Sequence, residues 1–146
     1  MKRQPHYRAI IMVAIFFLTA FAKDLKAQHS ITFFANISDT APSEWLGHVW
    51  VGFCDGQTKR ILGFYPEGLV EDSNRLFDVK YTFKVTEAQY QKALKAIAEF
   101  DSATYLIGKK DCRRFAQTVA DYMGLKVPSI GLKSPAEWLG ALVDNN

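Results

Sequence analysis

The sequence lacks the short motifs on which most metal and nucleotide sites depend. It has two cysteines and three histidines, and it contains no Cys-x-x-Cys, no His-Glu-x-x-His and no glycine-rich phosphate loop. Zinc sites need closely spaced thiolates or imidazoles, and phosphate sites need glycines that let the backbone approach the ligand. We therefore expect no metal and no other cofactor.

The chain beyond residue 27 also lacks an excess of positive charge. The whole sequence carries 18 Lys and Arg residues and 15 Asp and Glu residues. Residues 1–27 hold five of these bases and one of the acids, which leaves 13 bases and 14 acids, a net charge of −1. Nucleic-acid-binding domains usually carry a basic surface. We therefore expect no nucleic-acid partner.

The first 27 residues have the pattern of a secretory signal peptide. Three basic residues precede an apolar run over residues 9–22, and small-residue cleavage sites end at Ala22 and Ala27. A run of 14 residues is shorter than the roughly 20 that a membrane-spanning helix needs. We expect the signal to be removed, no stable membrane anchor to remain, and residues 28–146 to form a single periplasmic or secreted domain.

Hydrophobic patterning predicts an α+β fold. Alternating runs rich in β-formers predict strands, and apolar spacing with capping residues predicts helices after Thr86 and Ser134 and around Cys112, the last of these ending at Gly124. We expect an antiparallel sheet of about four strands with helices packed on it. The strands are expected at residues 30–37, 48–53, 60–65 and 77–85.

Cys112 is the first candidate for chemistry. It stands at the expected first turn of a helix, and Lys109, Lys110, Arg113 and Arg114 surround it. A helix N-terminus and nearby cations favour a thiolate, so we expect a pKa well below the value of about 8.5 for a free cysteine. Such a thiol is a candidate nucleophile if a base can reach it, and otherwise it is a buried cysteine or half of a disulfide.

His48 is the candidate base, because it is the one histidine inside a strand-like run. In the alternative interpretation it is a strand histidine bound to the backbone. Its strand also carries Cys54, six residues further on, which an extended strand places about 20 Å away. A disulfide requires Cα atoms within about 7 Å. We therefore expect His48 and Cys112 to meet and both cysteines to be free thiols.

Four segments together resemble the circularly permuted papain-like cysteine hydrolases, a superfamily that includes bacterial cell-wall amidases and the lecithin-retinol acyltransferase group. They are residues 47–53, 63–66, Tyr105 and 111–116. In this superfamily the histidine strand precedes the cysteine helix, as it does here. The resemblance implies a permuted papain-like fold, with Cys112 as nucleophile and His48 as base.

The resemblance also implies a third, orienting residue on the strand beside His48. If a four-residue loop pairs Cys54 with Lys59, Tyr65 faces His48, whereas a two-residue turn brings Gly63 there. We select Tyr65, with a packed core aromatic as the alternative. Trp50 and Trp45 flank His48, either as the lining of a substrate cleft or as core residues.

The function implied by the resemblance is an exported cysteine hydrolase. It would cleave an amide bond through a thioester on Cys112, with a peptide or amide substrate that includes peptidoglycan. Relatives commonly carry Asn where this chain has Asp111, and a carboxylate there would raise the pKa of the thiol. The alternative is therefore a catalytically inactive, secreted binding or interaction domain on the same fold.

Overall fold

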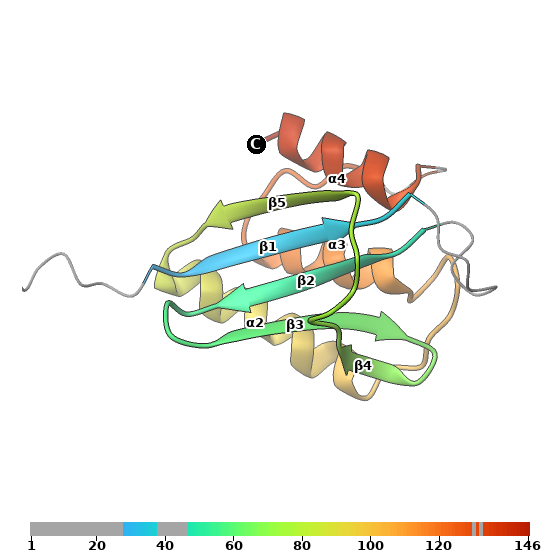
Figure 1. Cartoon of the computed structure of the whole chain (residues 1–146), viewed down its shortest axis with the longest axis horizontal. Coiled ribbons are helices and arrows are strands. Elements are labelled where there is room, and N and C mark those ends of the chain that lie inside the picture. Colours follow the sequence, from blue (N-terminus) through green and yellow to red (C-terminus); the bar gives the residue numbers. More distant parts are fainter. Residues whose placement is uncertain (1–27, 38–46, 130, 132) are drawn as a thin grey trace, which may run out of the picture.

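The computed structural model describes residues 28–37, 47–129, 131 and 133–146. The expected signal peptide and Trp45 lie outside these residues. The described chain is α+β, as predicted, with one antiparallel sheet and three helices (Figure 1). The strands are β1 (Ser30–Ala35), β2 (Val49–Cys54), β3 (Lys59–Tyr65), β4 (Gly68–Glu71) and β5 (Val79–Lys84), and the helices are α2 (Glu87–Asp101), α3 (Cys112–Tyr122) and α4 (Pro135–Asp144).

The sheet has five strands in the order β4-β3-β2-β1-β5, one more than the sequence predicted. The additional strand is β4, which follows β3 after the two residues Pro66 and Glu67 and pairs with it antiparallel. Gly68 opens β4 with a φ of +111°, a conformation that suits glycine. A four-residue edge strand that begins in turn residues is too short to show a period of two in the sequence.

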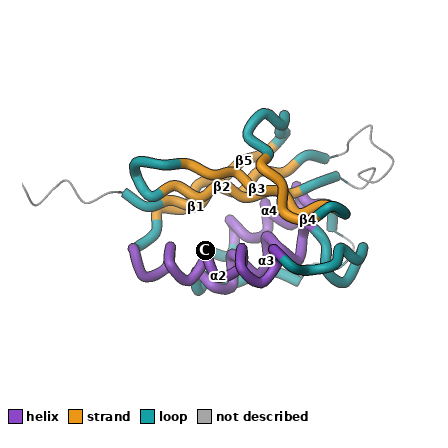
Figure 2. Tube along the Cα trace, turned by 90° about the horizontal axis from the view of Figure 1, so that it is seen from below, coloured by secondary structure: helices purple, strands orange, loops and turns teal. Residues whose placement is uncertain are grey.

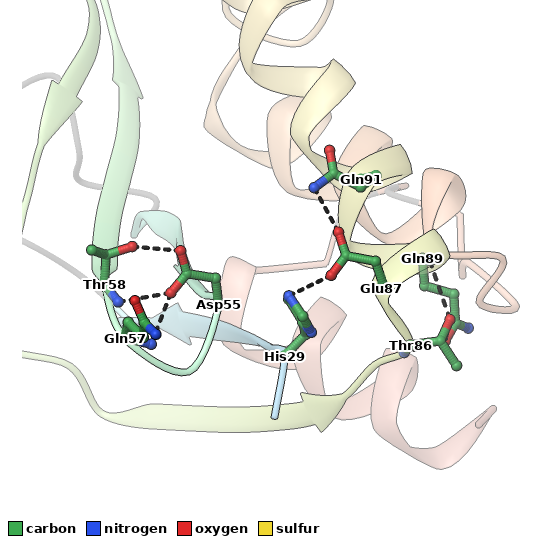
Figure 3. Close-up of polar contacts among 8 residues, drawn as sticks. All are labelled: His29, Asp55, Gln57, Thr58, Thr86, Glu87, Gln89 and Gln91. Carbon is green, nitrogen blue, oxygen red and sulfur yellow. Dashed lines mark hydrogen bonds and ion pairs between the residues drawn. The ribbon is translucent and has the colours of Figure 1, made fainter. Parts of the chain in front are cut away.

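The loop between β2 and β3 has four residues, and Cys54 pairs with Lys59, which is the first of the two predicted alternatives. Asp55 organises this loop. Its carboxylate accepts hydrogen bonds from the backbone N–H groups of Gln57 and Thr58 and from the Thr58 hydroxyl (Figure 3). These donors lower the pKa of Asp55 from 3.8 to about 2.

This loop is expected to make stability depend on pH in acid. Because the folded-state pKa of Asp55 lies below its unfolded value, its stabilisation is complete above pH 3.8 and disappears as the pH falls toward about 2. The difference in melting temperature between the wild type and Asp55→Asn should therefore shrink between about pH 4 and pH 2. Thr58→Val removes the hydroxyl donor but keeps the backbone donors. Its difference in melting temperature from the wild type should therefore also shrink as the pH falls, but by a smaller amount. A difference that stays constant from pH 5 to pH 2 would refute the assignment.

The helices cover one face of the sheet (Figure 2). The main core lies between this face of the sheet and the helices. It contains Val49, Val51 and Phe53 of β2 together with the inward faces of α2, α3 and α4. On the other face, Trp50 forms a smaller buried cluster with Phe34 and Ile61. Strand β2 is thus buried on both faces, with side chains alternating between the two clusters.

The chain between β4 and β5 crosses the face that the helices leave uncovered. It must cross the sheet because β4 and β5 form opposite edges, and Figure 1 shows it passing over the three strands between them. Both ends of the crossing are tied to strand backbone. The N–H of Asp72 donates to the carbonyl of Ile61 at 2.8 Å, and that of Asp78 donates to Ala35 at 3.0 Å.

All three helices begin where the sequence predicted. Thr86 and Ser134 form capping boxes with Gln89 and Glu137 respectively, and Figure 3 shows the Thr86 contact. Beside this cap, His29 forms an ion pair with Glu87 at 2.7 Å, which ties the start of β1 to α2. Cys112 is the first residue of α3, and Gly124, with a φ of +80°, follows its end.

Candidate functional site

Asp111 is the N-cap of α3 and fixes the position of Cys112. One carboxylate oxygen accepts from the backbone N–H of Arg114 at 3.1 Å, and the other accepts from that of Gly108 at 2.8 Å. The guanidinium of Arg113 lies 3.7 Å from the second oxygen. Asp at this position is thus an effective cap, because it satisfies the N–H of Arg114 in the first helical turn and also ties the preceding loop to the helix start.

The thiol of Cys112 is buried, with 6% of the residue exposed. Burial raises its pKa from 9.0 to about 11, and the negative charge of Asp111 acts in the same direction. The backbone N–H of Val49 and the charge of Arg113 oppose this rise but do not overcome it. The expectation of a lowered pKa was therefore wrong, because the cost of desolvating a thiolate exceeds the help from the helix terminus.

The segment before β2 holds the backbone of His48 in a fixed place. Gly47 has a φ of +84°, and a Cβ there would lie only 2.5 Å from the carbonyl oxygen of Asn36. The side-chain oxygen of Asn36 accepts a hydrogen bond from the backbone N–H of His48 at 2.5 Å, and the backbone N–H of Asn36 donates to the His48 carbonyl at 3.0 Å. Asn36 is buried and was not recognised from the sequence, where nothing links it to His48.

The imidazole of His48 packs against two aromatic rings on the face without helices. Its centroid lies 4.4 Å from the ring of Tyr65 and 5.8 Å from that of Trp50, both nearly parallel to it. The register of β2 and β3 places Tyr65 opposite His48, as the four-residue loop predicts. Trp50 shares the face of His48, as expected, and is 1% exposed, so it packs in the interior and does not line an open cleft.

The two residues of the predicted dyad, His48 and Cys112, are far apart in the sequence but lie near the same end of β2. The sulfur of Cys112 lies against the backbone N–H of Val49, the residue that follows His48. In the sequence, 63 residues lie between His48 and Cys112. However, Cys112 belongs to the core on the helix side, whereas the imidazole points to the face that carries Trp50. The structure thus brings the two residues to one strand end and directs the imidazole away from the helix side.

Tyr105 is a further neighbour of the thiol. Its hydroxyl interacts with the Cys112 side chain, and burial raises the pKa of this phenol well above its usual value, with the charges of Cys112 and Asp111 adding to the effect. Tyr105 was predicted only as part of the resemblance. Its contact with the sulfur gives the thiol a polar neighbour on the helix side.

Both cysteines are free thiols, as predicted. Cys54 ends β2, at the opposite end of that strand from Val49. An open cavity of about 400 Å³ lies at the start of α3, lined in part by Lys109, Arg113 and Arg114. It adjoins the solvent-facing side of the helix start, whereas Cys112 packs into the core.

Comparisons with known proteins identify no relative of this chain, so the site is interpreted from its own geometry. No protein-family model, curated protein or solved structure matches the chain. Within the part of the chain that the structure describes, no group of three or more His, Cys, Asp or Glu side chains could hold a metal ion. Nor does any helix in that part have the length and apolar character to cross a membrane.

The raised pKa has a direct consequence for alkylation. With a pKa of about 11, the thiolate fraction of Cys112 at pH 7 is about 300-fold smaller than that of a free cysteine with a pKa of about 8.5. Iodoacetamide should therefore modify Cys54 first, and the rate at Cys112 should still be rising above pH 9. Asp111→Asn, which keeps a capping side chain, should speed the reaction at Cys112. Peptide mapping by mass spectrometry measures both rates, and a midpoint for Cys112 below pH 8 would contradict the burial argument.

Proposed function

We propose that the chain is an exported cysteine hydrolase that cleaves an amide bond through a thioester on Cys112. One observation carries the proposal, namely the contact between the sulfur of Cys112 and the backbone N–H of the residue after His48. Two segments so far apart in the sequence have no local reason to meet. A cysteine at a helix start beside a strand that directly follows a histidine is also the arrangement that the resemblance to permuted papain-like hydrolases leads us to expect.

The protonation state of the thiol determines how such a reaction would proceed. With a pKa of about 11, Cys112 carries its proton at neutral pH, so a base must remove this proton as the sulfur attacks the carbonyl carbon. His48 is the base in this proposal. It accepts the thiol proton, donates it to the departing amine, and then activates the water that hydrolyses the thioester. The imidazole must turn from the Trp50 side toward the sulfur for this transfer.

The substrate class follows from the compartment. If the first 27 residues direct export, the domain encounters the cell wall, and peptide bonds of peptidoglycan are the leading amide substrates. No cofactor is needed, because the thiol and the imidazole supply the nucleophile and the proton transfers.

A second candidate is a catalytically inactive binding domain on the same fold. Two observations favour it: the burial that raises the pKa of Cys112, and the direction of the His48 imidazole toward Trp50 and Tyr65. In this alternative Asp111 acts only as a helix cap and Cys112 only as a core residue.

Product analysis separates the two candidates. The protein is incubated with purified peptidoglycan and with synthetic wall peptides, and new amino termini are identified by mass spectrometry. Acid quenching during turnover should also trap an acyl adduct on the peptide that contains Cys112. Cleavage together with this adduct supports the hydrolase. Sedimentation of the protein with peptidoglycan, without products or adduct, would instead establish the binding domain.

A further inference from the structure

A polar cluster on the helix-free face holds the aromatic ring against which His48 packs. The Tyr65 hydroxyl donates a hydrogen bond to the carboxylate of Asp72 and accepts one from the Arg75 guanidinium at 3.0 Å. The Tyr65 ring therefore contacts the imidazole along its face, while its far end is held by two charged side chains.

Arg75 also contacts the second ring beside His48. Its guanidinium carbon lies 5.4 Å from the ring of Trp50 and 5.8 Å from that of Tyr65, within the range of cation–π attraction. One side chain thus bridges the two aromatic rings that pack on the imidazole. A movement of Arg75 would change both contacts.

A glycine makes room for this arrangement. A Cβ at Gly63 would lie 2.4 Å from the Cε2 of Tyr65 and 3.0 Å from its hydroxyl oxygen. The Tyr65 ring therefore lies back over the Gly63 backbone, in a place that another residue would occupy. Leu or Val at this position would be the usual choice for a strand, so the glycine is explained by the ring.

The segment that supplies the two charged residues is itself anchored. Asp72 is bonded through its backbone to Ile61, and Asp78 is bonded to Ala35 through its backbone and to the N–H of Ile37 through its carboxylate at 2.8 Å. Arg75 lies between these two anchors. The crossing segment between β4 and β5 is therefore held at both ends, and Asp72 lies at the first of them.

We propose that Asp72 and Arg75 are positioning residues that act through Tyr65 to set the plane of the His48 imidazole. The role of His48 as a base rests on the proposed function, but the positioning itself is a property of the folded chain. The hydroxyl of Tyr65 is the link, because it connects the charged pair to the ring that contacts the imidazole. Removing the hydroxyl, or the charge that holds it, releases that ring.

Nuclear magnetic resonance of the full chain with ¹⁵N-labelled histidine tests the positioning without any substrate. His48→Gln assigns the imidazole signals, and His29, which pairs with Glu87 at the other end of the sheet, is the internal reference. Tyr65→Phe keeps the ring and removes only the hydroxyl, and Asp72→Asn removes only the charge. Both should shift the His48 nitrogen signals and leave those of His29 in place. Gly63→Ala, which displaces the ring but keeps the hydroxyl, should shift them as well.

Tyr81→Phe is the matched control, because Tyr81 is an exposed tyrosine on β5. It should leave the His48 signals unchanged. If Tyr65→Phe and Asp72→Asn also leave them unchanged, the positioning role is refuted, whatever the protein catalyses.

Kinetics supply the second readout. On a peptide that the wild type cleaves, Tyr65→Phe and Asp72→Asn should raise kcat several-fold with little change in KM, because they loosen the stack that the imidazole leaves to reach the sulfur and do not touch the binding of substrate. If the wild type cleaves nothing while the His48 signals still move in the variants, the proposed function fails and the positioning role stands. Equal kcat in the wild type and both variants would overturn the role of the cluster in catalysis.

Discussion

Cys112→Ala is expected to abolish thioester formation and to lower turnover at least about 1,000-fold, since nothing else in the proposed reaction can attack the carbonyl carbon. The variant should remain folded. Alanine is well tolerated in a helix, and the change removes only one small buried group, at a cost of about 1 kcal/mol. The measurement is the initial rate of peptide cleavage, with circular dichroism and melting temperature as the check on folding.

Cys54→Ala is the matched control, because it removes the other free thiol at the far end of β2. Its turnover should equal that of the wild type. His48→Ala should lower turnover about 100- to 10,000-fold, the usual range for losing a general base. Undiminished cleavage by Cys112→Ala would eliminate the hydrolase mechanism, and undiminished cleavage by His48→Ala would eliminate this histidine as the base.

The features of the fold that local sequence determines were predicted correctly. Capping residues such as Thr86 and Ser134 act within a single helical turn, so their spacing is enough to locate a helix start. The position of Tyr65 beside His48 followed from the length of one loop, which sets the register of β2 and β3. Strand β4 was missed because four residues at a sheet edge give no periodic signal.

The orientation of His48 could not be predicted, for a different reason. The alternation along β2 correctly placed His48 and Trp50 on the same face. It did not show which face the helices cover, because Trp50 and Gly52 are buried on one face just as Val49, Val51 and Phe53 are on the other. Strands that are buried on both faces give no polar side as a reference.

The environment of the site depends on contacts between distant parts of the chain. The position of Cys112 at a helix start was predicted correctly, but the depth of its burial, which raises the pKa of the thiol to about 11, depends on the packing of α3 against β2. In the same way, Asp72 and Arg75 reach Tyr65 only because the chain crosses from one sheet edge to the other. The residue pattern within one segment can predict neither the burial of Cys112 nor the contacts of Tyr65, because both depend on how distant segments pack.

Gly47→Ala is expected to destabilise the fold by roughly 2 to 5 kcal/mol. The positive φ of Gly47 would cost an alanine about 1 to 2 kcal/mol. Its Cβ would also lie 2.5 Å from the carbonyl oxygen of Asn36 and 2.8 Å from that of Ile37, both of them backbone atoms that cannot rotate away. Relieving such overpacking typically costs a further 1 to 3 kcal/mol or so. Urea denaturation followed by circular dichroism gives the free energy of unfolding.

Gly124→Ala separates the two costs. Gly124 has a φ of +80°, close to that of Gly47, but a Cβ there would meet nothing within 4 Å. Gly124→Ala should therefore show only the conformational cost, and the excess loss in Gly47→Ala measures the clash with the segment around Asn36. Asn36 forms hydrogen bonds with both the backbone N–H and the backbone carbonyl of His48. The clash should therefore also shift the imidazole signals of His48, whereas Gly124→Ala should leave these signals unchanged. Equal destabilisation in the two variants, with His48 undisturbed, would mean that Gly47 serves the turn alone and has no part in placing the histidine.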